Sequence, residues 1–436
     1  MSSEWTFAPL ENFLEALIDY RGKTPEKTSE GIPLITAKII KGGRIEKPTE
    51  FIAVDNYDSW MRRGIPKEGD VVLTVEAPLG EVAQLGPEKI ALAQRVVTLR
   101  GKEGILDNSY LLYLLQTEEM LEQLKSRSTG TTVLGIKQSE LRKVPLSLPP
   151  INQQRTTAQT LKALDDRITL LRETNTTLEA IALALFKSWF VDFDPVHAKA
   201  EGLDPEGMDA DIAAMFPDSF EQSELGLIPR GWVVKPIGDA VDCIGGGTPN
   251  TKDSRFWEPA EYAWTTPKDL SGLQSPVLLS TERKLSTLGL AKVSSGLLPA
   301  GTLLLSSRAP IGYLAIAQMP IAVNQGYIAI PSGGELSPLY MLFWCRQNME
   351  GIKARANGST FMEISKKAFR PIPALVPSAK VLVAFANVAD PLFERLIENE
   401  RQAQTLTKLR DTLLPRLISG KLRLPEAKAL AKAANL

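Results

Sequence analysis

Apolar side chains recur at spacings of three and four residues over two long stretches of the chain. Such sustained spacing predicts long helices with an apolar stripe that packs on another helix. The first stretch follows Pro149-Pro150. Its stripe consists of Leu161, Leu164, Ile168, Leu171, Asn175, Leu178, Ala182, Leu185 and Trp189. The second stripe consists of Phe385, Ala389, Leu392, Leu396, Asn399, Ala403, Leu406, Arg410, Leu413 and Leu417.

The two stripes predict helices that pair with each other, because neither half of the chain offers another stripe of comparable length. The alternative is that each helix packs on its own domain. A helix of about 40 residues would span ~60 Å, so the paired arrangement would hold the flanking domains apart at a fixed distance. Asn175 and Asn399 stand within the stripes. A polar residue there can fix the register of the pair; the alternative is that both face solvent.

The segment before each long helix has a mixed pattern. The strand-like runs Asp70–Val75 and Thr302–Ser306 follow glycine turns. Helical patterns follow them at Ser109–Lys125 and Leu339–Ala354. The pattern in each half of the chain therefore predicts a mixed α/β domain followed by a long helix.

Short motifs recur in the same order in the two halves. Offsets that drift by a few residues indicate two copies of one domain with loop insertions, and not an array of short repeats. The matches are Ala77-Pro78-Leu79-Gly80 with Ala309-Pro310-Ile311-Gly312 at an offset of 232, Gly22-Lys23-Thr24-Pro25 with Gly246-Gly247-Thr248-Pro249 at 224, Gly130-Thr131-Thr132 and Ile136 with Gly358-Ser359-Thr360 and Ile364 at 228, Pro145 with Pro371, and Pro150 with Pro377.

These patterns predict an α+β protein with two mixed domains in tandem, separated by two long helices that form an antiparallel coiled coil, with a pseudo-two-fold internal repeat. The predicted segments are a first mixed domain at 1–150, a central helical spacer at 151–200, an acidic linker at 201–230, a second mixed domain at 231–377 and a C-terminal helical spacer at 378–436.

Composition and charge refine this picture only slightly. The 436 residues suffice for several domains, and 44% hydrophobic with 23% charged residues is ordinary for a globular protein. The net charge of −1 is an average, because residues 201–230 hold eight acidic residues and one basic residue. Without this stretch the chain carries +6. No apolar run is long enough to span a membrane, and the amino terminus lacks a signal-peptide pattern. We therefore expect a cytoplasmic protein.

Few residues can support catalysis or metal binding. His197, Cys243 and Cys345 are the complete set of His and Cys residues, whereas a structural zinc site usually has four such ligands. Leu17 stands where a phosphate-binding loop ending in Gly22-Lys23-Thr24 would require glycine. The glycine run Gly245–Gly247 precedes Pro249, which favours a tight turn over a phosphate site. We predict no catalytic residue and no metal site.

Basic and hydroxyl residues beside the matched motifs are the candidates for binding. Lys and Arg neutralise phosphates, and Ser, Thr and Asn hydrogen-bond to phosphate oxygens. Each such residue alone is more often a solvated surface group, but their recurrence in both halves favours binding. The candidates are Lys23, Thr24, Lys38, Lys41, Arg44, Arg127, Thr131, Thr132 and Lys137 in the first half, and Thr248, Lys268, Arg308, Arg355, Asn357, Ser359, Thr360 and Lys366 in the second.

The layout resembles the DNA-specificity subunits of Type I restriction–modification systems. The resemblance rests on the matched motifs, on Leu148-Pro149-Pro150, and on two helix ends, Leu185–Phe193 (LFKSWFVDF) and Leu413–Lys421 (LLPRLISGK). It covers nearly the whole chain. It implies that the two mixed domains are target-recognition domains that bind a two-part site in double-stranded DNA, and that the chain has no activity of its own.

The resemblance also implies protein partners. These are two methyltransferase subunits and, within the complex, motor-nuclease restriction subunits, which would hold S-adenosylmethionine, ATP and Mg²⁺. No cofactor is then expected on this chain. The alternative function is a scaffold whose paired domains bind proteins and not DNA.

Overall fold

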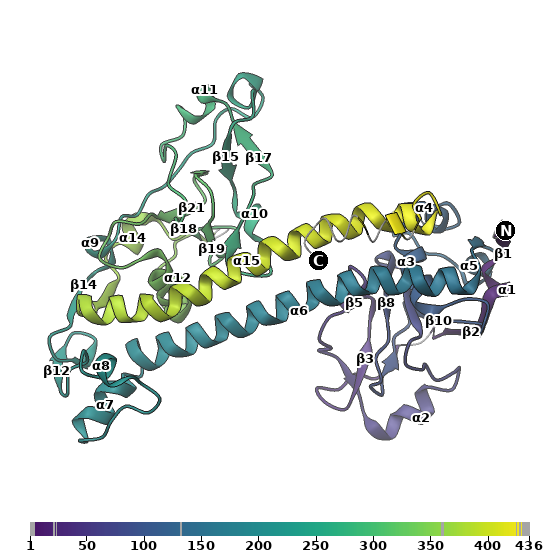
Figure 1. Cartoon of the computed structure of the whole chain (residues 1–436), viewed down its shortest axis with the longest axis horizontal. Coiled ribbons are helices and arrows are strands. Elements are labelled where there is room, and N and C mark those ends of the chain that lie inside the picture. The colour runs from purple at the N-terminus through teal and green to yellow at the C-terminus, as the bar shows by residue number, and fades with distance from the viewer. Residues whose placement is uncertain are drawn as a thin grey trace. The chain divides into compact units, whose positions relative to one another are not determined.

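The computed structural model describes residues 5–20, 22, 24–130, 133–358, 362–423, 425–426 and 429. The chain divides into two compact units, one made of residues 1–168 and 404–436 and the other of residues 169–403, here called unit 1 and unit 2. The boundaries of the units fall inside the two long helices and not at their ends. Figure 1 labels the elements.

Unit 1 is built on a four-stranded antiparallel sheet in the order β2-β10-β7-β8. β7 is buried at all five positions, as its largely apolar sequence VVLTV predicts. The strands are β1 (Thr6–Pro9), β2 (Leu14–Asp19), β3 (Ile32–Ile35), β4 (Ile40–Lys41), β5 (Arg44–Ile45), β6 (Phe51–Ile52), β7 (Val71–Val75), β8 (Leu79–Gln84), β9 (Ala91–Leu92), β10 (Val96–Gly101) and β11 (Pro145–Leu148).

Helices of unit 1 cover this sheet and lead into the long helix α6. The predicted helix at Ser109–Lys125 is two helices, because Thr117 ends one and caps the next by accepting a hydrogen bond from the Met120 N–H. The helices are α1 (Leu10–Phe13), α2 (Tyr57–Trp60), α3 (Asn108–Leu115), α4 (Glu118–Ser126), α5 (Gln138–Arg142) and the first part of α6 (Ile151–Phe190), with short 3₁₀ turns at Ala37–Ile39 and Val54–Asn56.

Unit 2 has its own four-stranded sheet, in the order β16-β19-β18-β21. Its antiparallel strands β19-β18-β21 correspond to β8-β7-β10 of unit 1, whereas β16 adds to β19 in parallel. Its other pairs include the hairpin β12-β13 and the antiparallel pair β14-β22. The strands are β12 (Phe220–Ser223), β13 (Gly226–Pro229), β14 (Val233–Pro236), β15 (Tyr262–Thr265), β16 (Val277–Leu278), β17 (Arg283–Leu285), β18 (Leu303–Ser306), β19 (Leu314–Ala317), β20 (Ala322–Val323), β21 (Tyr327–Ile330) and β22 (Pro373–Val376).

The helices of unit 2 again include a broken pair, since the predicted helix at Leu339–Ala354 is interrupted at Asn348. An aromatic cluster of Phe186, Phe190, Tyr340 and Phe385 joins α6, α12 and α15 in the core. The helices are α7 (Asp194–Ala200), α8 (Ala210–Ala213), α9 (Ile237–Ala240), α10 (Pro267–Leu270), α11 (Thr287–Leu290), α12 (Pro338–Gln347), α13 (Met349–Ala354), α14 (Lys366–Phe369) and α15 (Ala379–Ile418), with a 3₁₀ turn at Ser254–Phe256.

The internal repeat is visible in the strand pairing of the two units. β1 pairs with β11 just before α6, and β14 pairs with β22 just before α15, both antiparallel. A short parallel pair, β3-β9 in unit 1 and β15-β20 in unit 2, occupies the same place in each order of elements. The peptide bonds before Pro78 and Pro310 are both cis. The predicted fold class, two mixed domains in tandem with a repeated topology, is confirmed.

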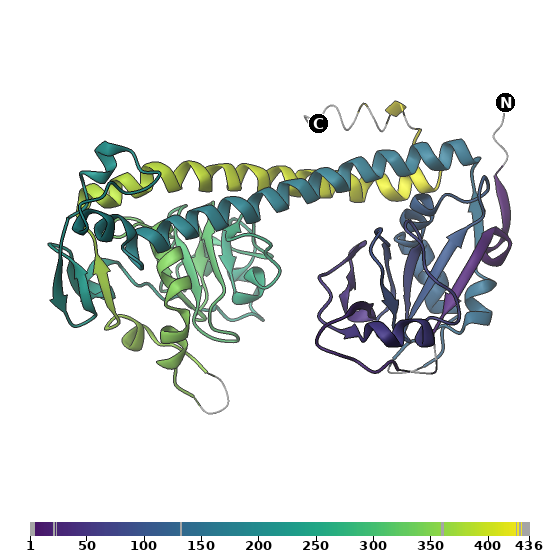
Figure 2. The same ribbon diagram turned by 90° about the horizontal axis from the view of Figure 1, so that it is seen from below.

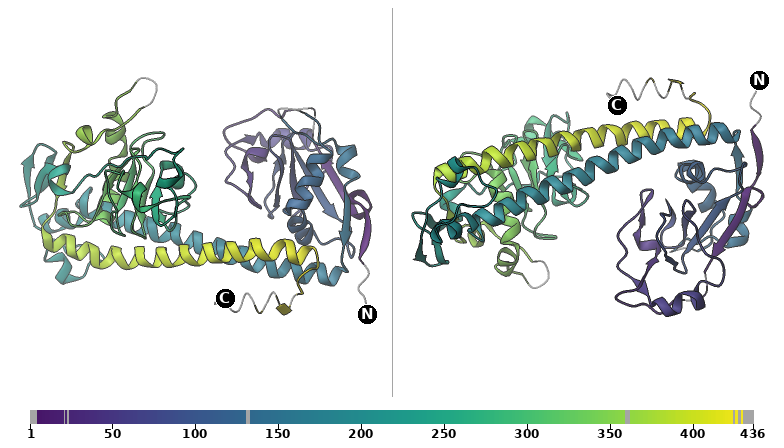
Figure 3. Two further views of the ribbon diagram at one scale, coloured as in Figure 1. Left: turned by 90° about the horizontal axis from the view of Figure 1, so that it is seen from above. Right: turned by 60° about the horizontal axis from the view of Figure 1, so that its bottom comes forward.

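The two long helices run antiparallel within unit 2. Asn175 of α6 lies against Asn399 of α15, and Phe186 further along α6 lies against Phe385, which is earlier in α15. The α6–α15 pair lies along one side of the sheet of unit 2 (Figure 2), and Figure 3 shows it from two further sides. Asn399 Nδ2 donates to Asn175 Oδ1 at 3.0 Å, and Asn175 Nδ2 donates to the Leu396 carbonyl at 3.2 Å.

Most residues of the predicted stripes are buried. Three apolar residues of the seam are only half-buried, namely Leu178, Leu185 and Leu392. The buried seam residues are Leu164, Ile168, Leu406 and Leu413 in unit 1, and Leu171, Asn175, Leu396 and Asn399 in unit 2. In unit 1 the polar seam residue Arg410 forms an ion pair with Asp165 of α6 at 2.7 Å.

The acidic stretch at 201–230 has more structure than a linker requires. It contains α8 and the β12-β13 hairpin, and Phe216 and Ile228 are buried in the core of unit 2. The physical reason is that its few apolar residues are large and pack beside Trp189 and Trp232, while its carboxylates stay in water. In the part of the chain that the structure describes, no helix combines the length and apolar character needed to cross a membrane.

Candidate nucleic-acid interface

In unit 1 two motifs that are far apart in the sequence lie side by side. The backbones of Thr129 and Gly135 exchange two hydrogen bonds of 2.9 Å, which hold the two ends of segment 129–135 together; a segment whose ends pair in this way is here called a closed loop. The Ile136 N–H then donates to the Val75 carbonyl at 3.0 Å. This pairing places the closed loop 129–135 beside the turn that follows β7 at Ala77-Pro78.

Unit 2 contains the same arrangement. Asn357 and Glu363 exchange backbone hydrogen bonds of 3.0 and 2.9 Å, and the Ile364 N–H donates to the Ser307 carbonyl at 2.9 Å. The closed loop 357–363 therefore lies beside the turn at Ala309-Pro310. Each unit thus brings together the matched motifs that reveal the duplication in the sequence.

In unit 1 a small hollow of about 160 Å³ lies beside the turn at Ala77-Pro78. Thr24, Lys38 and Ala77 line it, together with Gln94 and Arg95. Lys27 and Glu50 also line it and form an ion pair of 2.8 Å, so a carboxylate lies beside the hydroxyl, ammonium, amide and guanidinium groups. The latter groups are donors suited to phosphate oxygens and base edges.

The glycine turn of unit 2, at residues 245–249, is held by backbone contacts. The Gly247 N–H donates to the Val323 carbonyl at 3.0 Å, and Trp264 Nε1 donates to the Gly247 carbonyl at 3.1 Å. A Cβ on Gly246 would lie 1.7 Å from the Val323 oxygen, so only glycine fits there. The glycine run is a tight turn packed on β20, and it holds Thr248 with its hydroxyl 2.6 Å from Gln325 Oε1.

Two glutamines, Gln94 and Gln325, are functional candidates that sequence reasoning missed. Both follow the second strand of the short parallel pair by two residues, because Ile35 pairs with Leu92 and Thr265 with Val323. The residue after each glutamine accepts an equivalent backbone hydrogen bond. The Arg95 carbonyl accepts from the Val75 N–H, and the Gly326 carbonyl accepts from the Ser307 N–H. Their offset of 231 residues fits the drift of the other motifs, but one shared residue is too weak a signal to be noticed alone.

Lys38 and Lys268, which each follow a threonine by two residues, lie on the surface and face carboxylates. Lys38 Nζ is 4.0 Å from Glu50, and Lys268 Nζ is 2.8 Å from Glu282. The hydrogen bond to Glu282 raises the pKa of Lys268. Exposed ion pairs of this kind are weak and are screened by salt. A DNA phosphate can therefore replace either carboxylate.

Other candidates surround the closed loops. Arg127 approaches Glu140 at 3.7 Å, and Arg308 approaches Glu363 at 3.8 Å. Arg355 Nη1 donates to the Gly351 carbonyl at 2.9 Å, which leaves its other donors available. Lys137 and Lys366 are exposed at the start of α5 and α14. A Cβ on Gly245 would lie 3.1 Å from Lys366 Nζ, so this ammonium lies beside the glycine turn.

Two candidates are engaged elsewhere. Arg44 Nη2 donates to the backbone carbonyl of Asp165 in α6 at 3.2 Å, and Lys41 pairs with Glu46 at 3.0 Å. These contacts give Arg44 a structural partner within unit 1 and bring neither residue to the closed loop. Five further candidates lie outside the residues that the structure describes: Lys23, Thr131, Thr132, Ser359 and Thr360.

The closed loops also carry exposed apolar residues, which are not among the candidates predicted from sequence. Val133 and Leu134 are 49% and 39% exposed in unit 1, and Met362 is 50% exposed at the matched place in unit 2. An exposed apolar residue near arginines can contact a thymine methyl group, insert at a base step or contact a protein.

A family model described as "Type I restriction modification DNA specificity domain" matches residues 2–180 and 229–407. The chain belongs to this family. The second matched segment begins 227 positions after the first, within the range of offsets between the repeated motifs. The two copies of the specificity domain are thus the two repeats seen in the sequence and in the fold.

Relatives of the family cover most of the chain. The MjaIX specificity subunit of a Type I restriction enzyme of Methanocaldococcus jannaschii is 29% identical over 372 residues, which is 84% of this chain and 80% of the relative. The HindI specificity subunit of Haemophilus influenzae is 27% identical over 381 residues, 77% of this chain and 82% of the relative. The crystal structure of the S subunit from M. genitalium shares the fold, with a TM-score of 0.59, 18% identity, and coverage of 95% of this chain and 96% of the other.

Among the residues described in this specificity-domain protein, no three His, Cys, Asp or Glu side chains are grouped to hold a metal ion. His197 lies on α7 with its ring 4.5 Å from that of Phe220. Cys345 is fully buried in α12, and Cys243 is buried just before Ile244, which pairs with Ala329 of β21. Burial raises the pKa of both thiols, so both stay protonated at neutral pH.

Proposed function

We propose that this chain is the non-catalytic DNA-recognition subunit of a Type I restriction–modification complex. In this proposal the surface around the closed loop 129–135 binds one part of a bipartite target, and the surface around loop 357–363 binds the other. The observation that carries the proposal is the repeated surface itself, in which a closed loop, a Thr-Pro turn, a lysine and a glutamine recur in both units.

The chemistry of these groups suits duplex DNA. Lysines and arginines neutralise phosphates and set the position of the protein on the backbone. An amide side chain has a donor and an acceptor, which match the N6 and N7 edge of adenine in the major groove. Gln94 and Gln325 are therefore the groups through which sequence is most directly read in this proposal.

The partners supply what this chain lacks. We infer that two methyltransferase subunits bind it directly and that motor-nuclease restriction subunits join the complex in the cytoplasm. S-adenosylmethionine, ATP and Mg²⁺ belong to those subunits. The net charge of −1 supports a role for the partners in affinity, because bulk charge gives this chain little attraction for DNA.

Selection of bound sequences from a random DNA library, with the methyltransferase subunit present, tests the proposal. We expect a motif of two conserved parts separated by a gap of fixed length. A single continuous motif, or no motif, would contradict it.

A second candidate function, a protein-binding scaffold, is favoured by the exposed apolar residues Val133, Leu134 and Met362. The dependence of DNA affinity on salt separates the two functions. Phosphate binding releases counterions, so the affinity of a DNA-recognition subunit falls steeply as salt rises. An affinity that barely changes with salt would favour the scaffold.

A further inference from the structure

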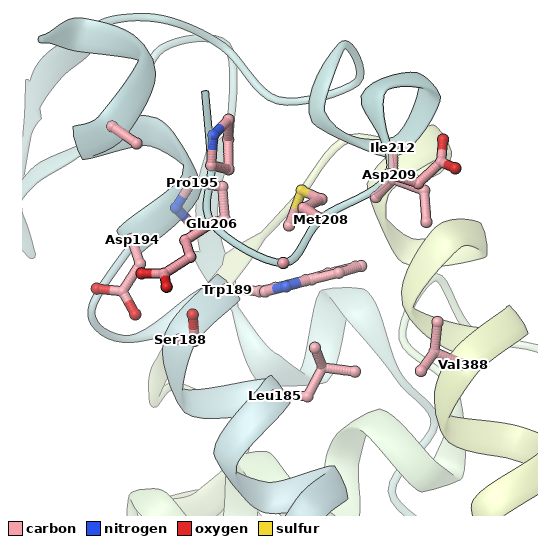
Figure 4. A pocket seen from close by; sticks show the side chains of 13 residues that line it. Leu185, Ser188, Trp189, Asp194, Pro195, Glu206, Met208, Asp209, Ile212 and Val388 are labelled. Atoms are coloured by element: carbon pink, nitrogen blue, oxygen red, sulfur yellow. The ribbon is translucent and has the colours of Figure 1, made fainter. Parts of the chain in front are cut away.

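Two tryptophans of unit 2 differ in what covers their rings. Trp189 lies beside Met208 and other apolar side chains of a cavity at the end of α6, as Figure 4 shows. Trp257 instead has a cation on its face, because Arg283 Cζ lies 3.4 Å from the centroid of its ring. The same guanidinium is 5.8 Å from the ring centroid of Trp264. Since both rings are buried, their attraction for the cation holds this arginine side chain in place.

The guanidinium of Arg283 keeps its hydrogen-bond donors available. Among the residues that the structure describes, its side chain forms neither an ion pair nor a hydrogen bond. The adjacent carboxylate, Glu282, pairs with Lys268 at 2.8 Å. Arg283 is half-buried at the start of β17, so its donors can reach a ligand at the surface. A guanidinium stacked on an aromatic ring with its donors available is preorganised for a bidentate contact.

Hydrogen bonds of the two rings place this arginine beside the glycine turn of unit 2. Trp264 Nε1 donates to the Gly247 carbonyl, and Trp257 Nε1 donates to the Asn250 carbonyl, both at 3.1 Å. These two carbonyls flank Thr248, whose hydroxyl contacts the glutamine proposed above to read a base. The stacked guanidinium therefore lies next to the proposed DNA-binding surface of unit 2.

The strand register gives Arg283 a counterpart in unit 1. Trp264 of β15 pairs with the first residue of β20 on one side and with Arg283 on the other. Leu34 of β3 pairs in the same way with the first residue of β9, and its N–H donates to the Glu50 carbonyl at 2.9 Å. Glu50 therefore occupies in unit 1 the position that Arg283 occupies in unit 2.

The surroundings of Glu50 show which surface this position faces. Glu50 lines the hollow of unit 1 together with Lys38 and Gln94, and it pairs with Lys27 at 2.8 Å. The two units thus carry opposite charges at one equivalent position of the proposed DNA-binding surface. A carboxylate accepts a hydrogen bond from cytosine N4, whereas a guanidinium donates two hydrogen bonds to guanine O6 and N7.

We propose that Arg283 is a specificity-determining residue, which donates two hydrogen bonds to O6 and N7 of a guanine in the part of the target bound by unit 2. The proposal rests on the proposed function. Trp257 positions the guanidinium, and the planar fork of the arginine supplies both donors. We do not expect this contact in unit 1, because the carboxylate of Glu50 offers only acceptors.

Sequence selection from a random DNA library, with the methyltransferase subunit present, tests this role with two variants and a control. Arg283→Lys keeps the charge and the aliphatic stem over Trp257 but loses the bidentate fork, and Arg283→Ala removes the whole group. We expect both variants to reduce a preference of about tenfold for guanine at one position to about twofold or less, and to leave the other part of the motif unchanged. Lys284→Ala removes an exposed charge from the next residue of β17 and should leave the whole motif unchanged.

A phosphate contact would give a different result. Arg283→Ala would then weaken binding to all sequences alike and reduce the salt dependence of log affinity by about one, while the base preferences stay the same. That outcome would overturn the proposal, as would a bipartite motif in which Arg283→Lys changes no guanine. A wild-type chain that selects no bipartite motif would instead contradict the proposed function. We expect Arg283→Lys and Lys284→Ala to unfold at the wild-type midpoint, since a lysine at 283 still places a cation on the ring.

Discussion

Asn175 and Asn399 are buried where α6 meets α15 in unit 2, at 3% and 1% exposure. The spacing of the apolar stripes placed both residues on the seam, but it could not show that they face each other. Their mutual hydrogen bond satisfies two amides that would otherwise be costly to bury. A paired polar contact at one level of a helix pair fixes the register, because any slip would bury both groups unpaired.

We predict that Asn399→Leu lowers the free energy of unfolding by about 1–3 kcal/mol, because it leaves the Asn175 oxygen buried without its donor. The double variant Asn175→Leu/Asn399→Leu should lose less than the sum of the two single variants. Urea unfolding followed by tryptophan fluorescence measures this, since five of the seven tryptophans lie in unit 2. Strictly additive losses would show that the two amides do not act as a pair.

Gln94 and Gln325 are the candidate DNA-binding residues that the structure identifies and the sequence did not. In the sequence, each glutamine is a single identical residue with no matching motif around it. Only the matched strand pairs and hydrogen bonds of the two units reveal that Gln94 and Gln325 are equivalent. Lys38 and Lys268, by contrast, were found from sequence because each follows a threonine by two residues. Strand pairing brings together side chains that are far apart in the sequence, and such side chains form no local sequence pattern. The composition of this site could therefore not be predicted from sequence.

We predict that Gln325→Ala weakens DNA binding and relaxes the base preference in one part of the target, at a loss of about 1–3 kcal/mol. Gln94→Ala should act on the other part alone. Sequence selection with each variant and the methyltransferase subunit measures both effects. Gln222→Ala, an exposed substitution on β12, serves as the control. Relaxation of both parts by one variant would contradict the assignment of one part to each unit.

At the scale of elements, long periodic patterns were predicted well and short irregular ones were not. α6 and α15 are continuous over 40 residues each, as their stripes indicate. The helices predicted at Ser109–Lys125 and Leu339–Ala354 are broken, because capping at Thr117 and the turn at Asn348 interrupt patterns whose apolar positions continue on both sides of the break. The short strands β4, β6 and β9 escaped prediction because two residues carry no periodicity.

The first turn of α6 is fixed to unit 1 by one buried side chain. Gln154 Nε2 donates to the carbonyls of Ile105 and Pro149 at 2.9 and 2.8 Å, and Gln154 Oε1 accepts from the Asp107 N–H at 3.0 Å. These bonds tie the helix start to the chain just before α3. They explain why the start of this helix belongs to unit 1 and not to an independent spacer.

We predict that Gln154→Leu lowers the free energy of unfolding of unit 1 by about 1–3 kcal/mol, because three backbone groups lose their partner. The neighbouring change Gln153→Leu, at a half-buried position, should have a much smaller effect. Hydrogen exchange of peptides from unit 1 across a urea series reports this unit separately from unit 2. Equal effects of the two substitutions would mean that these bonds do not stabilise the helix start.

For the whole molecule, the duplication was the strongest prediction from sequence, because five matches in one order do not depend on any single residue. What sequence could not locate were the boundaries of the compact units. They fall at Ile168 in α6 and between Ala403 and Gln404 in α15, where the helices pass from the contacts of one unit to those of the other. Side-chain contacts such as Arg410 with Asp165 and Asn399 with Asn175 decide which unit each turn joins.

These boundaries are the points at which to test whether the helices set the distance between the two proposed DNA half-sites. One heptad inserted after Ile168 and one after Ala403 adds about 10.5 Å of helix and preserves the seam on both sides. At ~3.4 Å per base pair, the gap in the selected DNA motif should grow by about three base pairs. A heptad inserted after Ile168 alone offsets the seam and should lower the unfolding midpoint of the chain. An unchanged gap in the doubly extended protein would show that the helices do not set the spacing.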